Sequence, residues 1–181
     1  VVITIPVNLR SYFPSESARN FFATINVGYD FSTGEDSLEA VLKEVKRSFQ
    51  DNLTAEKMRE RMNALCALEH SVPLRLVPLP LKDIVLRIAN KVAARGVTAS
   101  FSNIGKVSMP KGMEELIHLF SVFACAGMLQ ACACSFGGVY VVSFASPFRV
   151  CETERIFFRE LARLGIRVAL TTNLPPEMEV H

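Results

Sequence analysis

The sequence predicts an α+β domain, a two-layer α/β sandwich in which helices cover a mixed, largely antiparallel sheet. Alternating apolar residues indicate strands in both halves of the chain, and apolar residues at three- and four-residue spacing indicate helices between them. A Gly-Gly pair joins two strand-like runs, as in a hairpin. The 181 residues suffice for one core, and we expect one domain over residues 1–173 and a tail over residues 174–181.

The first half of the chain predicts two strands followed by three helices. Residues 1–7 and 21–29 alternate as strands, and Pro6 should end the first strand or place it at a sheet edge, because proline has no N–H to donate. Helical spacing covers residues 38–49, 55–70 and 81–95. The third helix has an apolar stripe that we expect to be buried, formed by Ile84, Val85, Ile88 and Val92.

The second half predicts mainly strands. A short strand over residues 97–101 leads into a loop at residues 102–106. Further strands are expected over residues 116–125, 128–136 and 139–145, the last two joined by a type I′ turn at Gly137-Gly138. A helix over residues 155–165 and a final strand over residues 166–171 complete the domain.

Composition excludes several classes of protein. Hydrophobic residues make up 50% and charged residues 21% of the chain, which excludes a disordered protein. The net charge of +2 is too small for a dedicated nucleic-acid binder. The uncharged run 116–146 contains polar residues and a Gly-Gly pair, so we expect no transmembrane span. The apolar excess suggests that a partner, or another part of the same polypeptide, covers some of the surface.

No catalytic or metal-binding motif stands out. The five cysteines include no C-x-x-C pair, so we expect no metal site, reduced thiols and a cytoplasmic location. His70, His118 and His181 have no neighbouring residues that would make a nucleophilic relay, and the sequence contains no glycine-rich phosphate loop. From these patterns alone the chain is an α+β domain without a visible catalytic group.

The order of several short stretches nevertheless resembles a known family. Pro6-Val7-Asn8-Leu9-Arg10, followed by Arg19-Asn20 before a strand, is similar to the "PV-x-x-R … GN" stretch of CoA-dependent acyltransferases of the chloramphenicol acetyltransferase and condensation-domain superfamily. Residues 100–105, SFSNIG, resemble the "SN-x-x-G" or "SN-x-G" loop of their second half, nearest to the alcohol acetyltransferase branch. The hairpin, helix and last strand also follow the order of that half.

The resemblance implies the C-terminal half of such an enzyme, over about residues 1–173. In the family, two similar halves enclose a tunnel, and the first half carries the H-H-x-x-x-D-G motif whose second histidine is the general base. Because this chain has no H-x-x-x-D and opens directly in a strand without an initiator Met, we expect a fragment that lacks the base. The resemblance further implies acyl-CoA as co-substrate, with no tightly bound cofactor, and an alcohol or amine as acyl acceptor. The expected partners are the N-terminal half and, for the fragment alone, a second copy in a homodimer.

Five residues are candidates for the site. Ser102 and Asn103 could donate hydrogen bonds to an oxyanion, with Gly105 permitting close approach of the backbone, or Asn103 could only satisfy backbone groups at a strand end. Arg10 could hold that loop, bind a CoA phosphate or form a surface salt bridge. Asn20 is either a turn residue or a ligand. Two readings of other classes stay open, namely a non-catalytic scaffold of the same fold and a condensation-type domain with a carrier-bound donor.

Overall fold

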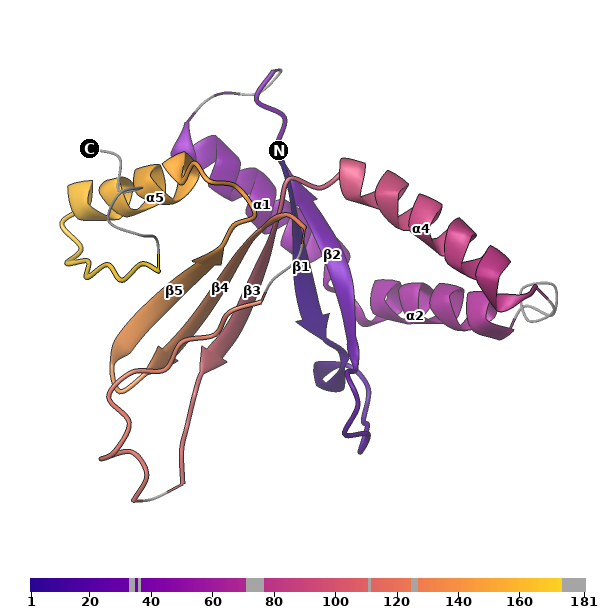
Figure 1. Cartoon of the computed structure of the whole chain (residues 1–181), viewed down its shortest axis with the longest axis horizontal. Coiled ribbons are helices and arrows are strands. Elements are labelled where there is room, and N and C mark those ends of the chain that lie inside the picture. The colour runs from indigo at the N-terminus through magenta and orange to yellow at the C-terminus, as the bar shows by residue number, and fades with distance from the viewer. Residues whose placement is uncertain (33–34, 36, 71–76, 111, 125–126, 174–181) are drawn as a thin grey trace. The chain divides into compact units, whose positions relative to one another are not determined.

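The computed structural model describes residues 1–32, 35, 37–70, 77–110, 112–124 and 127–173, which fall into two units, Val1–Pro147 and Phe148–His181 (Figure 1). The first unit contains strands β1 (Val2–Asn8), β2 (Phe22–Gly28), β3 (Ala99–Lys106), β4 (Leu129–Phe136) and β5 (Val139–Ala145), the 3-10 helix η1 (Leu9–Ser11), and helices α1 (Leu38–Asn52), α2 (Ala55–His70) and α4 (Leu79–Arg95). The second unit contains helix α5 (Glu152–Arg163). The tail predicted at residues 174–181 lies outside the described residues.

The five strands form one mixed sheet in the order β2-β1-β3-β4-β5. The β1–β2 and β4–β5 pairs are antiparallel, whereas β1–β3 and β3–β4 are parallel. The predicted α+β class with a mixed sheet is confirmed, but the sheet is evenly mixed rather than largely antiparallel. The reason is that the chain makes two long excursions, one after β2 and one over residues 107–128, and each returns it to lay down a parallel neighbour.

The hairpin between β4 and β5 has the predicted turn. Gly137 and Gly138 have φ angles of 57° and 81°, the left-handed conformation that both central residues of a type I′ turn require. Residues with side chains would be strained there, so this pair fixes the register that places Phe136 opposite Val139.

The core lies where α1 and α2 cover one face of β1 and β2. Ala23, Ile25 and Val27 of β2 point to this face and are buried, together with Leu9 and Met58. Partly buried residues of β1, α1 and α2 complete the cluster. The apolar residues that alternate along β2 and those that recur at helical spacing in α1 therefore pack in one core, as the sequence pattern indicates.

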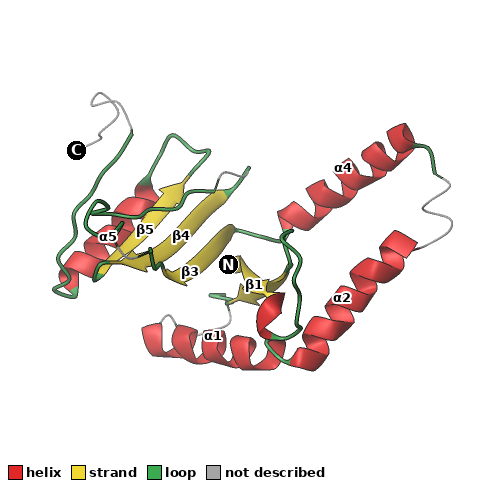
Figure 2. Cartoon of the chain, turned by 90° about the horizontal axis from the view of Figure 1, so that it is seen from below, coloured by secondary structure: helices red, strands yellow, loops and turns green. Residues whose placement is uncertain are grey.

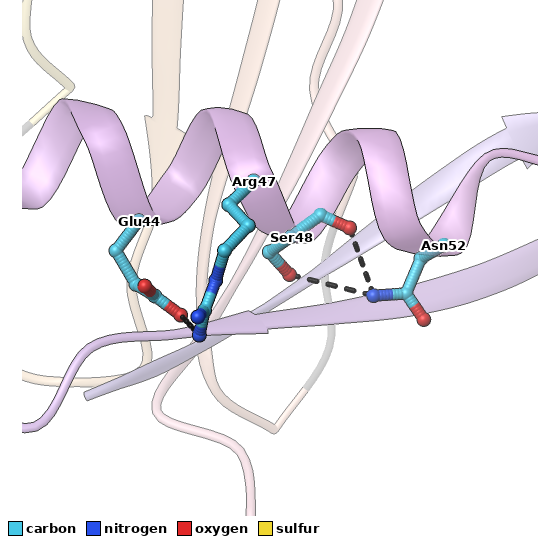
Figure 3. A network of polar contacts seen from close by, with 4 residues as sticks. All are labelled: Glu44, Arg47, Ser48 and Asn52. Atoms are coloured by element: carbon cyan, nitrogen blue, oxygen red, sulfur yellow. Dashed lines mark hydrogen bonds and ion pairs between the residues drawn. The ribbon is translucent and has the colours of Figure 1, made fainter.

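A polar network ties the two helices to the sheet. Asn52 at the end of α1 donates from Nδ2 to the carbonyl oxygen of Ser48 at 2.8 Å, next to the Glu44–Arg47 ion pair (Figure 3). Its Oδ1 accepts from Arg61 Nη2 of α2 at 2.8 Å, and Arg61 Nη1 donates to the carbonyl oxygen of Thr24 in β2 at 2.6 Å. Arg61 thus joins α2 to both α1 and β2.

Two predicted strands are wrong. Residues 116–124 contain no strand. Both edges of β4 are occupied, by β3 and β5, and the carbonyl oxygen of Phe120 accepts a hydrogen bond from Cys134 Sγ of β4 at 3.3 Å. Residues 166–171 also lack strand structure, and the described part of the second unit contains no strand with which they could pair. In both cases the apolar alternation is present, but the segment pairs with no strand in the described part of the chain.

Helix α4 forms as predicted, but its apolar stripe is exposed rather than buried. Ile84, Val85, Ile88 and Val92 are between 53% and 62% exposed, and Figure 2 shows α4 standing clear of the strands. None of the helices that the structure describes is long and apolar enough to cross a membrane.

Candidate functional site

The candidate site lies at a split between the parallel strands β1 and β3. These strands pair only at their beginnings, where Ile3 lies opposite Ala99 and Thr4 opposite Ser100. Both strands continue beyond this point, β1 to Asn8 and β3 to Lys106, but they no longer pair with each other. In Figure 1 their far ends diverge within the first unit. The split therefore interrupts the sheet between two of its inner strands.

The hydrogen bonds of β1 show which of its residues face β3. The odd-numbered residues bond to β2, since Val1 and Tyr29 exchange two backbone bonds of 2.9 Å and Leu9 N donates to the carbonyl oxygen of Phe21 at 3.1 Å. Val2 bonds in the other direction, accepting from Thr98 N at 2.8 Å and donating to Thr98 Oγ1 at 3.1 Å. Because backbone groups alternate along a strand, the even-numbered residues face β3.

Pro6 is therefore the residue at which the β1–β3 ladder fails. In the observed register, the bond after the Thr4–Ser100 pair would run from the N–H of residue 6 to the carbonyl oxygen of Phe101. Proline has no N–H, so this bond cannot form. The β1–β2 pairing is unaffected, since Pro6 turns its nitrogen away from β2 and lies in register opposite Thr24. Both expectations for Pro6 are therefore wrong: β1 continues past it to Asn8, and β1 is an inner strand of the sheet rather than an edge strand. Only the pairing with β3 stops before Pro6.

An open hollow of about 350 Å³ occupies the split. Four of the five candidate residues line it although they come from three segments of the chain: Arg10, Asn20, Ser102 and Asn103. The remaining lining residues are Pro6, Val7, Asn8, Ala18, Arg19, Phe21 and Phe22. Gly105 is not part of the lining. The hollow is within the usual volume of small-ligand sites, with polar groups set among apolar ones.

The expected Ser-Asn loop is a bulge inside β3. Strand β3 continues to Lys106, and its pairing with β4 shifts between Asn103 and Gly105, so that Ile104 is the extra residue. Gly105 has a φ angle of 79°, and its N–H donates to Asn103 Oδ1 at 2.9 Å. The prediction of a loop at residues 102–106 is therefore wrong, because the bulge accommodates the glycine without ending the strand.

The bulge determines which atoms of Asn103 are available. Its Oδ1 must face the Gly105 N–H, because only an oxygen can accept that bond. The Nδ2 group therefore faces away with two donor hydrogens, and no residue in the described part of the chain accepts from it. Asn103 is exposed and Ser102 partly buried. Both readings of Asn103 are compatible with this geometry, since the oxygen satisfies a backbone group and the nitrogen remains a donor.

Arg10 holds the segment before β2. Its Nη2 donates to the carbonyl oxygens of Ser17 at 2.6 Å and Arg19 at 2.8 Å, and its guanidinium carbon lies 6.0 Å from the centre of the Phe21 ring. Both hydrogen bonds go to the segment before β2 rather than to the β3 bulge, and Arg10 forms no ion pair with a carboxylate of the described residues. Asn20 lies in the irregular segment directly before β2. Arg10 therefore shapes one end of the hollow.

In the part of the chain that the structure describes, no histidine and no metal-binding cluster lies at the hollow; His181 lies outside the described residues. His70 ends α2 and His118 lies in the segment after β3, and neither lines the hollow. Within the described ranges, no group of three or more histidine, cysteine or acidic residues could hold a metal ion. Cys66, Cys132, Cys134 and Cys151 are free thiols, and Cys132 and Cys134 are buried in β4.

Sequence reasoning missed the role of β1 in the site. Pro6, Val7 and Asn8 form one wall of the hollow, opposite Ser102 and Asn103. The available signal was a proline inside an alternating run, which we interpreted as a strand end or a sheet edge. Comparisons of the chain with protein-family models, with curated proteins and with solved structures gave no match.

Proposed function

We propose that this chain is the C-terminal half of a CoA-dependent acyltransferase, which transfers an acyl group from acyl-CoA to an alcohol or amine. The observation that carries the proposal is the convergence of Arg10, Asn20, Ser102 and Asn103 on one hollow. These residues were selected from two separate motifs, more than 80 positions apart in the sequence. The folding of β1 beside β3 places both motifs at the same split.

The chemistry that these residues would supply is stabilisation of a developing negative charge. Attack of a hydroxyl or amine on the thioester carbonyl produces an oxyanion, which side-chain donors held in place can stabilise. Asn103 Nδ2 is such a donor, because the Gly105 N–H fixes the rotation of its amide. Ser102 offers a second hydroxyl donor at the same wall. The proton of the acceptor would go to a histidine of the N-terminal half, which would also cover the hollow and exclude water.

A scaffold role is the second candidate, favoured by the exposed apolar surface. Leu79, Leu81 and Leu86 of α4 are between 53% and 74% exposed, in addition to its predicted stripe. A domain whose role is to associate would need such a surface and no base. The sequence preceding Val1 separates the two candidates: an H-H-x-x-x-D-G motif there supports the enzyme, and its absence supports the scaffold. A donor bound to a carrier protein instead of CoA would need the same motif.

The proposal is tested in the longer polypeptide that carries the histidine motif. We expect Asn103→Ala to lower kcat for thiol release from acetyl-CoA by about 10²-fold, as for loss of an oxyanion donor, and to change KM less. Asn90→Ala, an exposed asparagine of α4, is the matched control and should leave both constants unchanged. An unchanged kcat in Asn103→Ala, together with a lower melting temperature, would show that Asn103 only stabilises the bulge.

A further inference from the structure

The sheet of the first unit has two outer strands, β2 and β5, and their outer sides differ. On β2, the carbonyl oxygen of Thr24 faces away from β1 and accepts from Arg61 Nη1 of α2 at 2.6 Å. A charged side chain on an edge strand is one of the devices that keep a sheet from pairing with another chain. On β5, no strand of the described residues pairs with the outer side (Figure 1). The sheet can therefore be extended at β5.

The hydrogen bonds of β4 show which backbone groups of β5 face outward. The carbonyl oxygen of Ser135 accepts from Val107 N at 2.8 Å, so Ser135 faces the β3 side. Backbone groups alternate along a strand, so the even-numbered residues of β4 face β5 and bond to its odd-numbered residues. The N–H and C=O groups of Tyr140 and Val142 therefore point to the outer side of β5. Among the described residues, no strand pairs with these groups.

We propose that the outer side of β5 pairs with β5 of a second copy of this chain, antiparallel about a two-fold axis at Val142. At the axis, the Val142 N–H of each copy donates to the Val142 carbonyl oxygen of the other, as in any bonded pair of an antiparallel ladder. The composition of the strand favours a second copy: β5 has no charged residue, no proline and no register shift. Self-pairing therefore places no like charges opposite each other. This inference does not depend on the proposed function.

The exposed side chains of β5 suit a seam between two strands. Tyr140 is 60% and Val139 is 46% exposed, although both are residue types that stabilise strands by packing against a neighbouring strand. The turn before β5 consists of Gly137 and Gly138, which have no side chains to obstruct a second strand. Pairing with a second copy would cover apolar surface and satisfy backbone groups in the same step.

The difference between the two outer strands limits the assembly to two copies. A two-fold axis at β5 uses the same strand of both copies, so the interface is closed and leaves no second β5 free. The strand that remains at each end of the joined sheet is β2, where Arg61 occupies the outward carbonyl oxygen of Thr24. We therefore expect a dimer and no larger species.

The test uses the whole 181-residue chain, sedimentation velocity over a dilution series and amide hydrogen exchange. In the unsubstituted chain, the Tyr140 and Val142 amides should exchange at least about tenfold more slowly in the dimer than in the monomer. Val142→Pro removes the outward N–H from both copies and should raise the Kd of the dimer at least about tenfold, because two backbone bonds are lost. Val142→Thr keeps the N–H and the branched side chain, so this matched control should dimerise as the unsubstituted chain does.

The proline variant should leave the hairpin of β4 and β5 intact. Pro6 shows that a proline whose nitrogen faces away from its antiparallel neighbour does not interrupt their pairing. Protection of the Val141 and Ser143 amides, which face β4, reports whether the hairpin has formed. If Val142→Pro does not fold, Val142→Lys replaces it, because two positive charges would then lie opposite each other at the axis. The same rise in Kd is expected, and added salt should reduce it.

Three results would overturn the inference. The first is an unsubstituted chain that stays monomeric at hundreds of micromolar. The second is a folded Val142→Pro variant that dimerises as tightly as the unsubstituted chain, which would show that the copies associate through another surface. The third is slow exchange of the Tyr140 and Val142 amides at concentrations where the chain is monomeric. This result would show that another segment of the same chain covers the outer side of β5.

Discussion

Replacement of Met58 by alanine measures how firmly α2 is anchored. Met58 is fully buried, at 0% exposure, in the cluster that also contains Leu9 and Ile25. The substitution removes three heavy atoms, worth roughly 2.4 kcal/mol at about 0.8 kcal/mol for each buried methylene-sized group. The cavity left behind adds to this, so we expect a loss of about 3 kcal/mol in the free energy of unfolding. For a chain of 181 residues this corresponds to a drop of roughly 6 to 12 °C in Tm.

The matched control is Ile88→Ala in α4. Ile88 is also an apolar helix residue, but it is 60% exposed, so its truncation should cost less than about 0.5 kcal/mol. Urea denaturation followed by circular dichroism, at protein concentrations too low for association, gives both values. If Ile88→Ala costs as much as Met58→Ala, the stripe of α4 is buried in solution, and the reasoning from exposure is refuted for this helix.

Three further predictions concern the junction of the helices, the missing base and the exposed surface. Arg61→Lys should lower the free energy of unfolding by about 1 to 3 kcal/mol, because lysine cannot reproduce the bonds to Thr24 and Asn52; an unchanged urea midpoint would contradict this. The 181-residue chain alone should release no thiol from acetyl-CoA, because a positioned histidine contributes about 10² to 10⁴-fold; turnover lost in His70→Ala or His118→Ala would place the base here. The chain should also form a two-fold dimer through the surface around Asn103 or a strand between residues 116 and 145, detected by light scattering over a dilution series; a monodisperse monomer at tens of micromolar that binds no hydrophobic dye would contradict this.

Local patterns predicted the elements whose formation needs few distant contacts. The helices over α1, α2 and α4 were identified from apolar spacing, and the β4–β5 hairpin from two glycines that both adopt positive φ angles. The strands expected at residues 116–125 and 166–171 were predicted wrongly, because strand formation depends on distant segments. A strand needs a free edge, and whether an edge is free depends on which other segments have already paired. Both edges of β4 are taken, a fact that no window of the sequence around residue 120 contains.

The apolar excess of the sequence is not used up by the core. Half of the residues are hydrophobic, yet in the described part of the chain only nine hydrophobic residues are buried, five in the cluster under α1 and α2 and four in β4. The stripe of α4 was expected to be buried because helical periodicity identifies an apolar face, but periodicity does not say what that face meets. In the described part of the first unit, α4 stands clear of the strands (Figure 2) and its predicted apolar stripe is exposed. The composition indicates that some apolar surface stays exposed, and the structure shows that part of this surface lies on α4.

At the candidate site, Pro6 permits pairing on one side of its strand and prevents it on the other. A proline in an alternating run argues against a strand that is paired on both sides, and this led to the expectation that the strand ends at Pro6 or lies at a sheet edge. The structure separates the two sides of the strand. Toward β2 the proline is harmless, because its nitrogen points the other way, and pairing continues to Asn8. Toward β3 it lacks the N–H that would continue the ladder beyond the Thr4–Ser100 pair, and residues of distant segments line the gap. The outcome depends on whether the backbone N–H at position 6 would point toward β2 or toward β3. This direction is known only once both neighbours of the strand are known.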